Sequence, residues 1–141
     1  MTSRRESIMA HITSTLAGTV GVSSRIYRSR NEAFARAESG AMVIEAGTDR
    51  AQVIANCKLE WSLDVNIAVY FRGAVPDQLA DPTIVSLHSK LMADRTLGGR
   101  AIDIVPTAVD PQIQAGDQPS AWIICSYMVR YRSSAAAIDA A

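Results

Sequence analysis

An uninterrupted alternation of apolar and polar residues is the feature of this 141-residue chain that most constrains its fold. Every odd position from Val53 to Phe71 is apolar, whereas the even positions between them are mostly polar. In a chain that is 48% hydrophobic, ten apolar residues at ten such positions arise by chance roughly once in a thousand sequences. Successive side chains of a strand point to opposite faces of a sheet, so the pattern predicts strand structure with one buried face.

The alternation is compatible with one long strand or with a hairpin. A two-residue turn would reverse the parity of the buried positions, but the parity is constant and no glycine or proline interrupts the segment. A turn of three or five residues would keep the parity, so a hairpin within residues 51–72 stays open. We expect one unusually long, bent strand, which would span about 60 Å at ~3.3 Å per residue. A compact domain of this length is only about 40 Å across, so the strand would project and need a neighbour to cover it.

Two amphipathic helices are expected, one before this strand in the sequence and one after it. Ser3-Arg4-Arg5-Glu6 is a capping box, in which Ser3 and Glu6 satisfy first-turn amides, and apolar residues at helical spacing follow it over residues 4–18. Asp81-Pro82 combines an N-cap residue with a proline at the first helical position, and a second apolar stripe continues from there to Asp94. Both helices should lay one apolar stripe on a sheet.

The remaining elements are shorter strands and loops. A turn is expected at Gly47-Thr48-Asp49, a helix-to-strand turn at Leu97-Gly98-Gly99, and Pro106 should place its strand at a sheet edge. Strands are expected over residues 25–28, 41–45, 101–109 and 121–132, and loops over residues 31–40 and 110–119. The sequence therefore predicts a single α+β domain over residues 1–132, with a mostly antiparallel twisted sheet, two main helices, and a disordered tail at 133–141.

The residue types that carry chemistry are sparse. Cys57 and Cys125 fall on apolar strand positions and are expected to be buried free thiols, while His11 and His88 lie too far apart in sequence for a local metal motif. The chain has no serine nucleophile motif and no phosphate-binding glycine loop, so we expect no catalytic, cofactor-binding or metal site and no enzyme activity. No secretory signal and no apolar run of about 20 residues is present, which predicts a cytoplasmic protein without membrane contact.

Charge offers one sharper hypothesis. The formal net charge is zero, which argues against a general nucleic-acid binder and suits association with copies of the same chain. Residues 1–40 hold six arginines against three glutamates, whereas residues 73–120 hold three basic against six acidic residues. One interpretation is scattered surface charge; the other is a protomer whose basic end meets the acidic end of the next. The arginines proposed for such an interface are Arg25, Arg28, Arg30, Arg130 and Arg132.

The layout from Arg4 to Arg132 resembles the tail terminator family of long-tailed bacteriophages, the group that includes the phage lambda terminator. The most specific piece is the Thr96-Leu97-Gly98-Gly99 turn followed by the Asp103-Ile104 strand. The other stretches that carry the resemblance are the N-terminal amphipathic helix, Arg25-Ile26-Tyr27, Leu63-Asp64-Val65-Asn66-Ile67-Ala68-Val69 and Tyr127-Met128-Val129-Arg130-Tyr131-Arg132.

The resemblance implies a structural virion protein with no catalytic residues. Six copies would form a ring on the last ring of the tail tube protein, stop its polymerisation, and present a surface to the head-completion or neck protein. DNA would pass through the lumen without sequence-specific binding, and the protein would be assembled in the cytoplasm of the host bacterium. The alternatives are another phage neck or tail ring protein, such as a tube or head–tail joining subunit, and a small-molecule-binding α+β module or enzyme.

Overall fold

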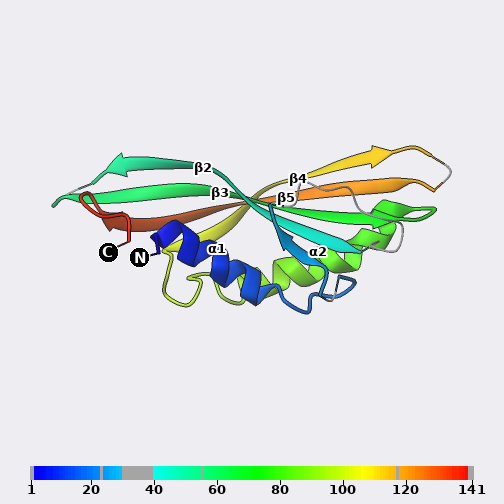
Figure 1. Ribbon diagram of the computed structural model, residues 1–141, viewed down its shortest axis with the longest axis horizontal. Coiled ribbons are helices and arrows are strands. Elements are labelled where there is room, and N and C mark those ends of the chain that lie inside the picture. The colour runs from blue at the N-terminus through cyan, green and yellow to red at the C-terminus, as the bar shows by residue number, and fades with distance from the viewer. Residues whose placement is uncertain (1, 23, 30–39, 55, 117, 140–141) are drawn as a thin grey trace.

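Two helices lie against one face of a five-stranded sheet (Figure 1), which is the α+β class expected from the sequence. The computed structural model describes residues 2–22, 24–29, 40–54, 56–116 and 118–139. Along the chain the elements are α1 (Arg4–Thr15), β1 (Ile26–Arg28), β2 (Ala41–Val53), β3 (Lys58–Arg72), α2 (Pro76–Met92), β4 (Asp103–Gln114) and β5 (Ser120–Ser134).

The sheet has the order β1-β2-β3-β5-β4, so the two longest strands lie side by side in its middle. β3 and β5 have 15 residues each and pair antiparallel over their whole length, from Lys58 opposite Ser134 to Arg72 opposite Ser120. β2 and β4 flank them in antiparallel pairs, and only β1 runs parallel to its neighbour. The β2–β3 turn therefore lies at one end of the molecule and the β4–β5 turn at the other (Figure 1).

The core lies between the helices and one face of the sheet. Odd residues of β3 and β5 point to this face, and Leu63, Val65, Ile67 and Val69 have no exposed surface. The helices contribute Ile8, Met9 and Ile12 from α1 and Ala80, Leu87 and Leu91 from α2. The alternation that dominates the sequence thus marks the buried face of β3, as expected.

The alternating segment is a hairpin followed by one long strand, so the expected single strand over all of it is wrong. β2 ends at Val53, and the Ile54 amide donates to the Lys58 carbonyl at 3.0 Å to close the turn. Asn56 and Cys57 each have φ near +59°, so two non-glycine residues supply the left-handed turn. The odd-numbered apolar pattern continues across the turn because three residues separate Ile54 from Lys58. β3 alone still spans about 50 Å.

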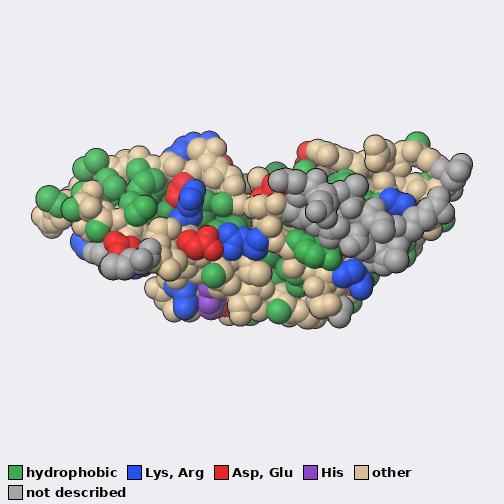
Figure 2. Space-filling view, in the orientation of Figure 1, with side chains coloured by type: hydrophobic (Ala, Val, Ile, Leu, Met, Phe, Trp, Pro, Cys, Tyr) green, Lys and Arg blue, Asp and Glu red, His purple; other side chains and the backbone are tan. Residues whose placement is uncertain are grey.

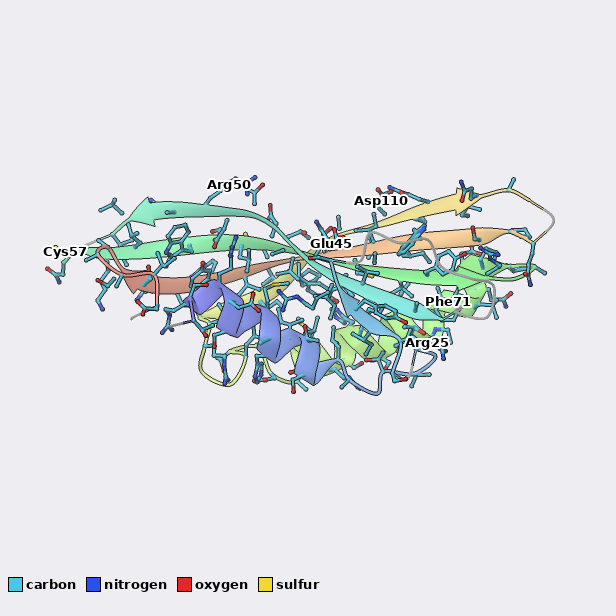
Figure 3. The ribbon with its side chains drawn as sticks, viewed as in Figure 1. Arg25, Glu45, Arg50, Cys57, Phe71 and Asp110 are labelled. Atoms are coloured by element: carbon cyan, nitrogen blue, oxygen red, sulfur yellow. The ribbon has the colours of Figure 1, made fainter. Side chains whose placement is uncertain are left out.

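Cys57 lies in this turn and is exposed (Figure 3), which corrects its expected burial on a strand. Cys125 is buried as expected. Burial raises the pKa of the Cys125 thiol to about 11. The turn that contains Cys57 ends an arm that extends past the start of α1 (Figure 1). We call residues 49–62 of this hairpin the β2–β3 arm.

The predicted turn at Gly47-Thr48-Asp49 is a β-bulge inside β2, so β2 is longer than expected. The register of β2 against β3 shifts between Ala46 and Asp49. A Cβ atom at Gly47 would lie 3.1 Å from the Asp64 carbonyl oxygen, which explains a small residue here. Before the bulge even residues of β2 face the helices; after it odd residues do, because Asp49 pairs with Leu63.

The helix boundaries differ from the expected ones. The Ser3 side chain accepts the Glu6 amide as predicted, but the Glu6 carboxylate binds Arg28 instead of closing the capping box, and α1 ends at Thr15. α2 begins at Pro76, so the predicted start at Asp81-Pro82 is wrong and Pro82 lies inside the helix. Pro76, and not Pro82, occupies the first helical position.

The last strands extend beyond their predicted bounds. β4 is an edge strand, as Pro106 predicts, and it continues to Gln114 into the expected loop. β5 continues to Ser134, past the expected domain limit at residue 132. Beyond it, the Ala135 amide donates to the Cys57 carbonyl at 2.8 Å, and the Arg4 amide donates to the Ile138 carbonyl at 2.9 Å. The loop predicted for residues 31–40 falls almost wholly outside the described residues.

Candidate functional site

Two of the predicted interface arginines are engaged inside the chain. Arg25 donates from Nε to the Gly40 carbonyl oxygen at 2.8 Å. Arg28 makes a two-pronged contact with the Glu6 carboxylate at 3.2 and 3.1 Å, and this hydrogen bonding lowers the pKa of Glu6. Both side chains therefore hold β1 and the residue before it against neighbouring parts of the chain. Arg30 lies outside the described residues.

The other two predicted arginines lie on the face of the sheet away from the helices. Arg132 lies 3.5 Å from Glu60 on β3. Arg130 is exposed and pairs across the sheet with Asp103, whose pKa is lowered mainly by its hydrogen bonds with Arg95. Arg28 points to the helix-covered face, so the described arginines do not form one patch. Figure 2 likewise shows charged side chains in small mixed groups on the visible side.

The face of the sheet away from the helices is polar at one end, and apolar and buried at the other. Over the β2–β3 arm, Arg50 donates to Asp64 at 3.2 Å. Toward the β4–β5 turn, Tyr70 is buried and Trp122 is half-buried, and their rings lie 4.9 Å apart, centroid to centroid. Ala41, Val43 and Tyr70 form a second buried cluster, with Tyr27, Ala68 and Trp122 packed against it.

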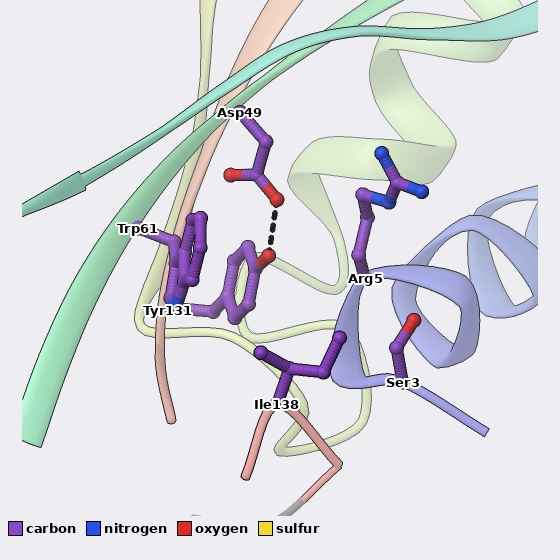
Figure 4. A pocket seen from close by; sticks show the side chains of 6 residues that line it. All are labelled: Ser3, Arg5, Asp49, Trp61, Tyr131 and Ile138. Carbon is purple, nitrogen blue, oxygen red and sulfur yellow. Dashed lines mark hydrogen bonds between the residues drawn. The ribbon is translucent and has the colours of Figure 1, made fainter. Parts of the chain in front are cut away.

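A cavity of about 300 Å³ lies on the helix side of the β2–β3 arm (Figure 4). It is bounded by three strands of the sheet, the first turn of α1 and the C-terminal segment. The lining residues are Ser3, Arg5, Asp49, Trp61, Tyr131 and Ile138. Figure 4 places Asp49 on one wall, and Arg5 and Ser3 on the opposite wall.

Aromatic rings form the floor of this cavity. Trp61 and Tyr131 are stacked, with an interplanar angle of 9° and centroids 6.1 Å apart. The Trp61 indole donates to the Ser133 hydroxyl at 2.8 Å, which fixes the ring against β5. The Arg4–Ile138 backbone bond holds the C-terminal segment against α1 and so keeps Ile138 at the mouth.

Asp49 is the unusual group in the cavity. Its Oδ2 accepts a hydrogen bond from the Tyr131 hydroxyl, but its Oδ1 is buried and accepts no hydrogen bond from any of the described residues. Burial raises the pKa of Asp49, although the hydrogen bond from Tyr131 acts in the opposite direction. Burial also raises the pKa of Tyr131 above its ordinary value, and the Asp49 carboxylate adds to that effect. The pair leaves this buried acceptor without a donor among the described residues, which costs free energy.

This site was not expected from the sequence, because Gly47-Thr48-Asp49 predicts a turn. The signal that would have found it is parity: Asp49 continues the odd-numbered series that begins at Val53 and faces the helices. Tyr131 lies 82 residues away, and only the pairing of β3 with β5 brings the two together.

The two histidines lie apart from this cavity's lining and have structural contacts. His11 Nε2 lies 2.7 Å from the Asp94 carboxylate, and this hydrogen bond lowers the pKa of Asp94. His88 Nδ1 lies 2.9 Å from the Tyr127 hydroxyl. Among the described residues, no three His, Cys, Asp or Glu side chains gather in a way that could hold a metal ion. Within that same part of the chain, no helix has the length and apolar character needed to cross a membrane.

Comparison with known proteins assigns no relative to the chain: it matches no model of a protein family, and no curated protein matches it significantly.

Proposed function

We propose that the chain is a ring-forming structural subunit of a phage tail, and that it acts as a tail terminator. In this role several copies, most simply six, close into a ring on the end of a tail tube. One ring face binds the last tube ring and stops its growth, while the opposite face offers a surface to a head-completion protein. The chain itself performs no chemistry in this mechanism.

The observation that carries the proposal is the difference between the two ends of the elongated sheet. One end carries the β2–β3 arm with its proline-free edge, and the other carries the β4–β5 turn beside an edge strand with Pro106 and Pro111 (Figure 1). A ring needs two different surfaces on each subunit, because every contact joins one surface to the other kind. An elongated subunit with dissimilar ends meets this requirement.

The order of elements also supports the proposal, because it is the order on which the resemblance to terminators is based. The helix over residues 4–15 comes first, and the Leu97-Gly98-Gly99 turn links α2 to β4, with positive φ at all three residues. The zero formal net charge adds little repulsion between copies. Most described arginines are engaged in contacts within the chain, so the contact between copies should depend on shape more than on a basic end meeting an acidic one.

Native mass spectrometry of the purified chain, followed by negative-stain imaging with tubes of the cognate tail tube protein, tests the proposal. We expect rings, alone at high concentration or on tube ends, and tubes that stop lengthening once capped. A chain that stays monomeric at every concentration and leaves tube ends bare and growing would overturn it. Tubes incubated with an unrelated protein of the same size provide the control.

The cavity at Asp49 is the observation that favours the alternative of a binding module. It has an apolar floor and a few polar groups on its walls, as ligand sites do, but at about 300 Å³ it is at the small end of the range for ligand pockets. A protein that binds a ligand there and never forms rings would fit this alternative better.

A further inference from the structure

A polar hollow of about 390 Å³ lies where α1 borders the turn that follows α2. In Figure 1 this turn, residues 93–102, is the loop that passes below α1. Ser7, His11 and Ser14 share one flank of α1, because residues three and four positions apart lie on the same side of a helix. The lining residues are Thr2, Ser7, Ala10, His11, Ser14 and Arg100, and none of these is acidic.

The turn brings Arg100 and His11 together at Gly98. A Cβ atom at Gly98 would lie 2.6 Å from Arg100 Nη1 and 3.1 Å from His11 Cε1, so a side chain there would displace both groups. Arg100 Nε donates to the Ser7 hydroxyl at 3.3 Å, which holds the guanidinium against α1. A hydroxyl that accepts a hydrogen bond still has its own proton, so Ser7 remains able to donate. Figure 2 shows a histidine next to a basic side chain along this border.

The hollow carries positive charge. A second guanidinium lies beside it, because Arg4 Nη2 donates to the Arg100 carbonyl oxygen at 3.4 Å. The ion pairs among the described residues include neither Arg4 nor Arg100. Asp94 is in contact with the lining, but its two oxygens are bonded to His11 and to the Gly98 amide. Two guanidinium groups against this one carboxylate leave a positive formal charge even when His11 is neutral.

We propose that this hollow binds a phosphate group. The Arg100 guanidinium pairs with two phosphate oxygens, and the hydroxyls of Ser7 and Ser14 donate to the others. Arg4 adds a second positive charge at the rim. The hollow is larger than a phosphate group, so it has room for part of the molecule that carries the phosphate, whether a nucleic-acid backbone or a soluble phosphate compound. This site does not depend on ring formation.

The donors of the hollow favour a phosphate over other ligands. Arginine forks and serine or threonine hydroxyls are typical partners of phosphate oxygens. They reach the hollow from two directions, α1 and the turn after α2, which suits a tetrahedral group better than a flat carboxylate with two oxygens. The first turn of α1 adds the positive end of the helix dipole. A cationic ligand would meet Arg4 and Arg100, which repel it.

Nuclear magnetic resonance of the full-length chain tests the proposal, with pyrophosphate as the probe. The chain has two histidines, so the imidazole signals of both can be followed separately. His88 is bonded to the Tyr127 hydroxyl outside the hollow and serves as the internal control. At fixed pH and ionic strength, we expect a saturable shift of the His11 signals and unchanged His88 signals. No shift of His11 at any pyrophosphate concentration would overturn the proposal.

A second measurement identifies the source of the phosphate. Fluorescence anisotropy of a labelled, short DNA duplex of mixed sequence is recorded at low salt, and unlabelled pyrophosphate is then added. Duplex binding that pyrophosphate reverses assigns the site to a nucleic-acid backbone, whereas binding of pyrophosphate alone assigns it to a soluble phosphate compound. Poly-glutamate is the comparison for acidic proteins. If poly-glutamate at equal charge displaces the bound probe as well as pyrophosphate does, the site is not specific for phosphate and the proposal is wrong.

Matched variants test the residues of the hollow. Ser14 is exposed, and Ser14→Glu and Ser14→Gln place side chains of equal size there that differ in charge. The glutamate variant should bind pyrophosphate about 10-fold or more weakly than the glutamine variant. Arg100→Gln should weaken binding by a similar factor and, where DNA binds, reduce the salt slope by about one. Arg50→Gln, on the opposite face of the sheet, is the control and should bind like the wild type.

Equal affinity within either pair of variants, the two at Ser14 or Arg100→Gln and Arg50→Gln, would refute the assignment of the hollow. Circular dichroism of each variant confirms that the fold is unchanged. None of these outcomes bears on whether the protein caps tail tubes, which is measured separately.

Discussion

Replacing Val65 tests the face assignment that the alternating pattern and the structure share. Val65 has no exposed surface and lies in the main core between its cross-strand neighbours Ala46 and Tyr127. Val65→Ala removes two buried methyl groups, about 1.6 kcal/mol at ~0.8 kcal/mol each, and the cavity left behind raises the loss to about 2–3 kcal/mol. Val65→Asp adds the burial of an unpaired carboxylate, several kcal/mol more, which approaches the whole stability of a typical domain.

Asn66→Asp is the matched control at the next position. Asn66 is half-buried on the opposite face, and its Oδ1 accepts from the Ser126 hydroxyl at 2.9 Å, a bond that aspartate can keep. Glu45 lies directly opposite on β2, so the added charge should cost about 0.2–1 kcal/mol. Urea denaturation followed by circular dichroism at neutral pH measures the free energies of unfolding. If Val65→Ala and Asn66→Asp lose the same stability, or Val65→Asp unfolds at the wild-type midpoint, the face assignment is wrong.

Two further variants test charged groups. Arg130→Glu combined with Arg132→Glu should leave the circular dichroism spectrum unchanged, because exposed ion pairs are worth at most ~1 kcal/mol each. The same double variant should weaken ring formation or tube-end binding, measured by sedimentation at low salt. If it assembles like the wild type at every salt concentration, these arginines are ordinary surface residues. Asp49→Asn should raise the melting temperature at pH 7, because burial raises the pKa of Asp49 and so disfavours its ionised form in the fold. That gain should vanish below the ordinary aspartate pKa of about 3.9, where Asp49 is protonated in both states; an equal effect at pH 3 and pH 7 would show that ionisation is not the cause.

The fold class and the buried face of β3 could be predicted because both follow from local periodicity. The boundaries could not, because they depend on residues far away in sequence. Pro82 looks like a helix start when only its neighbours are considered. In the structure α2 begins six residues earlier, where Pro76 is buried and Ala80 packs in the core. Burial against the sheet thus extends the helix through a proline that local preference would place at its end.

The hairpin at Cys57 shows a different limit. A turn whose length preserves parity leaves no trace in the alternation, and Asn56 and Cys57 adopt positive φ without a glycine to mark the position. The candidate cavity was only partly predictable. Odd-number parity with Val53 places Asp49 on the helix side. Its contact with Tyr131 depends on the pairing of β3 with β5, which no local pattern in the sequence indicates.

The unequal edges of the sheet limit how copies of this chain can associate. Growth by edge pairing needs two open edges on every subunit, since each added copy must offer an edge to the next. Pro106 and Pro111 on β4 remove amide donors from one edge, whereas residues 49–53 of β2 keep theirs. Edge pairing between copies would therefore end after one step instead of producing a filament. In the proposed role of a terminator the subunit must also avoid open-ended growth, so its contacts between the dissimilar ends of the sheet have to close into a ring instead of continuing as a filament.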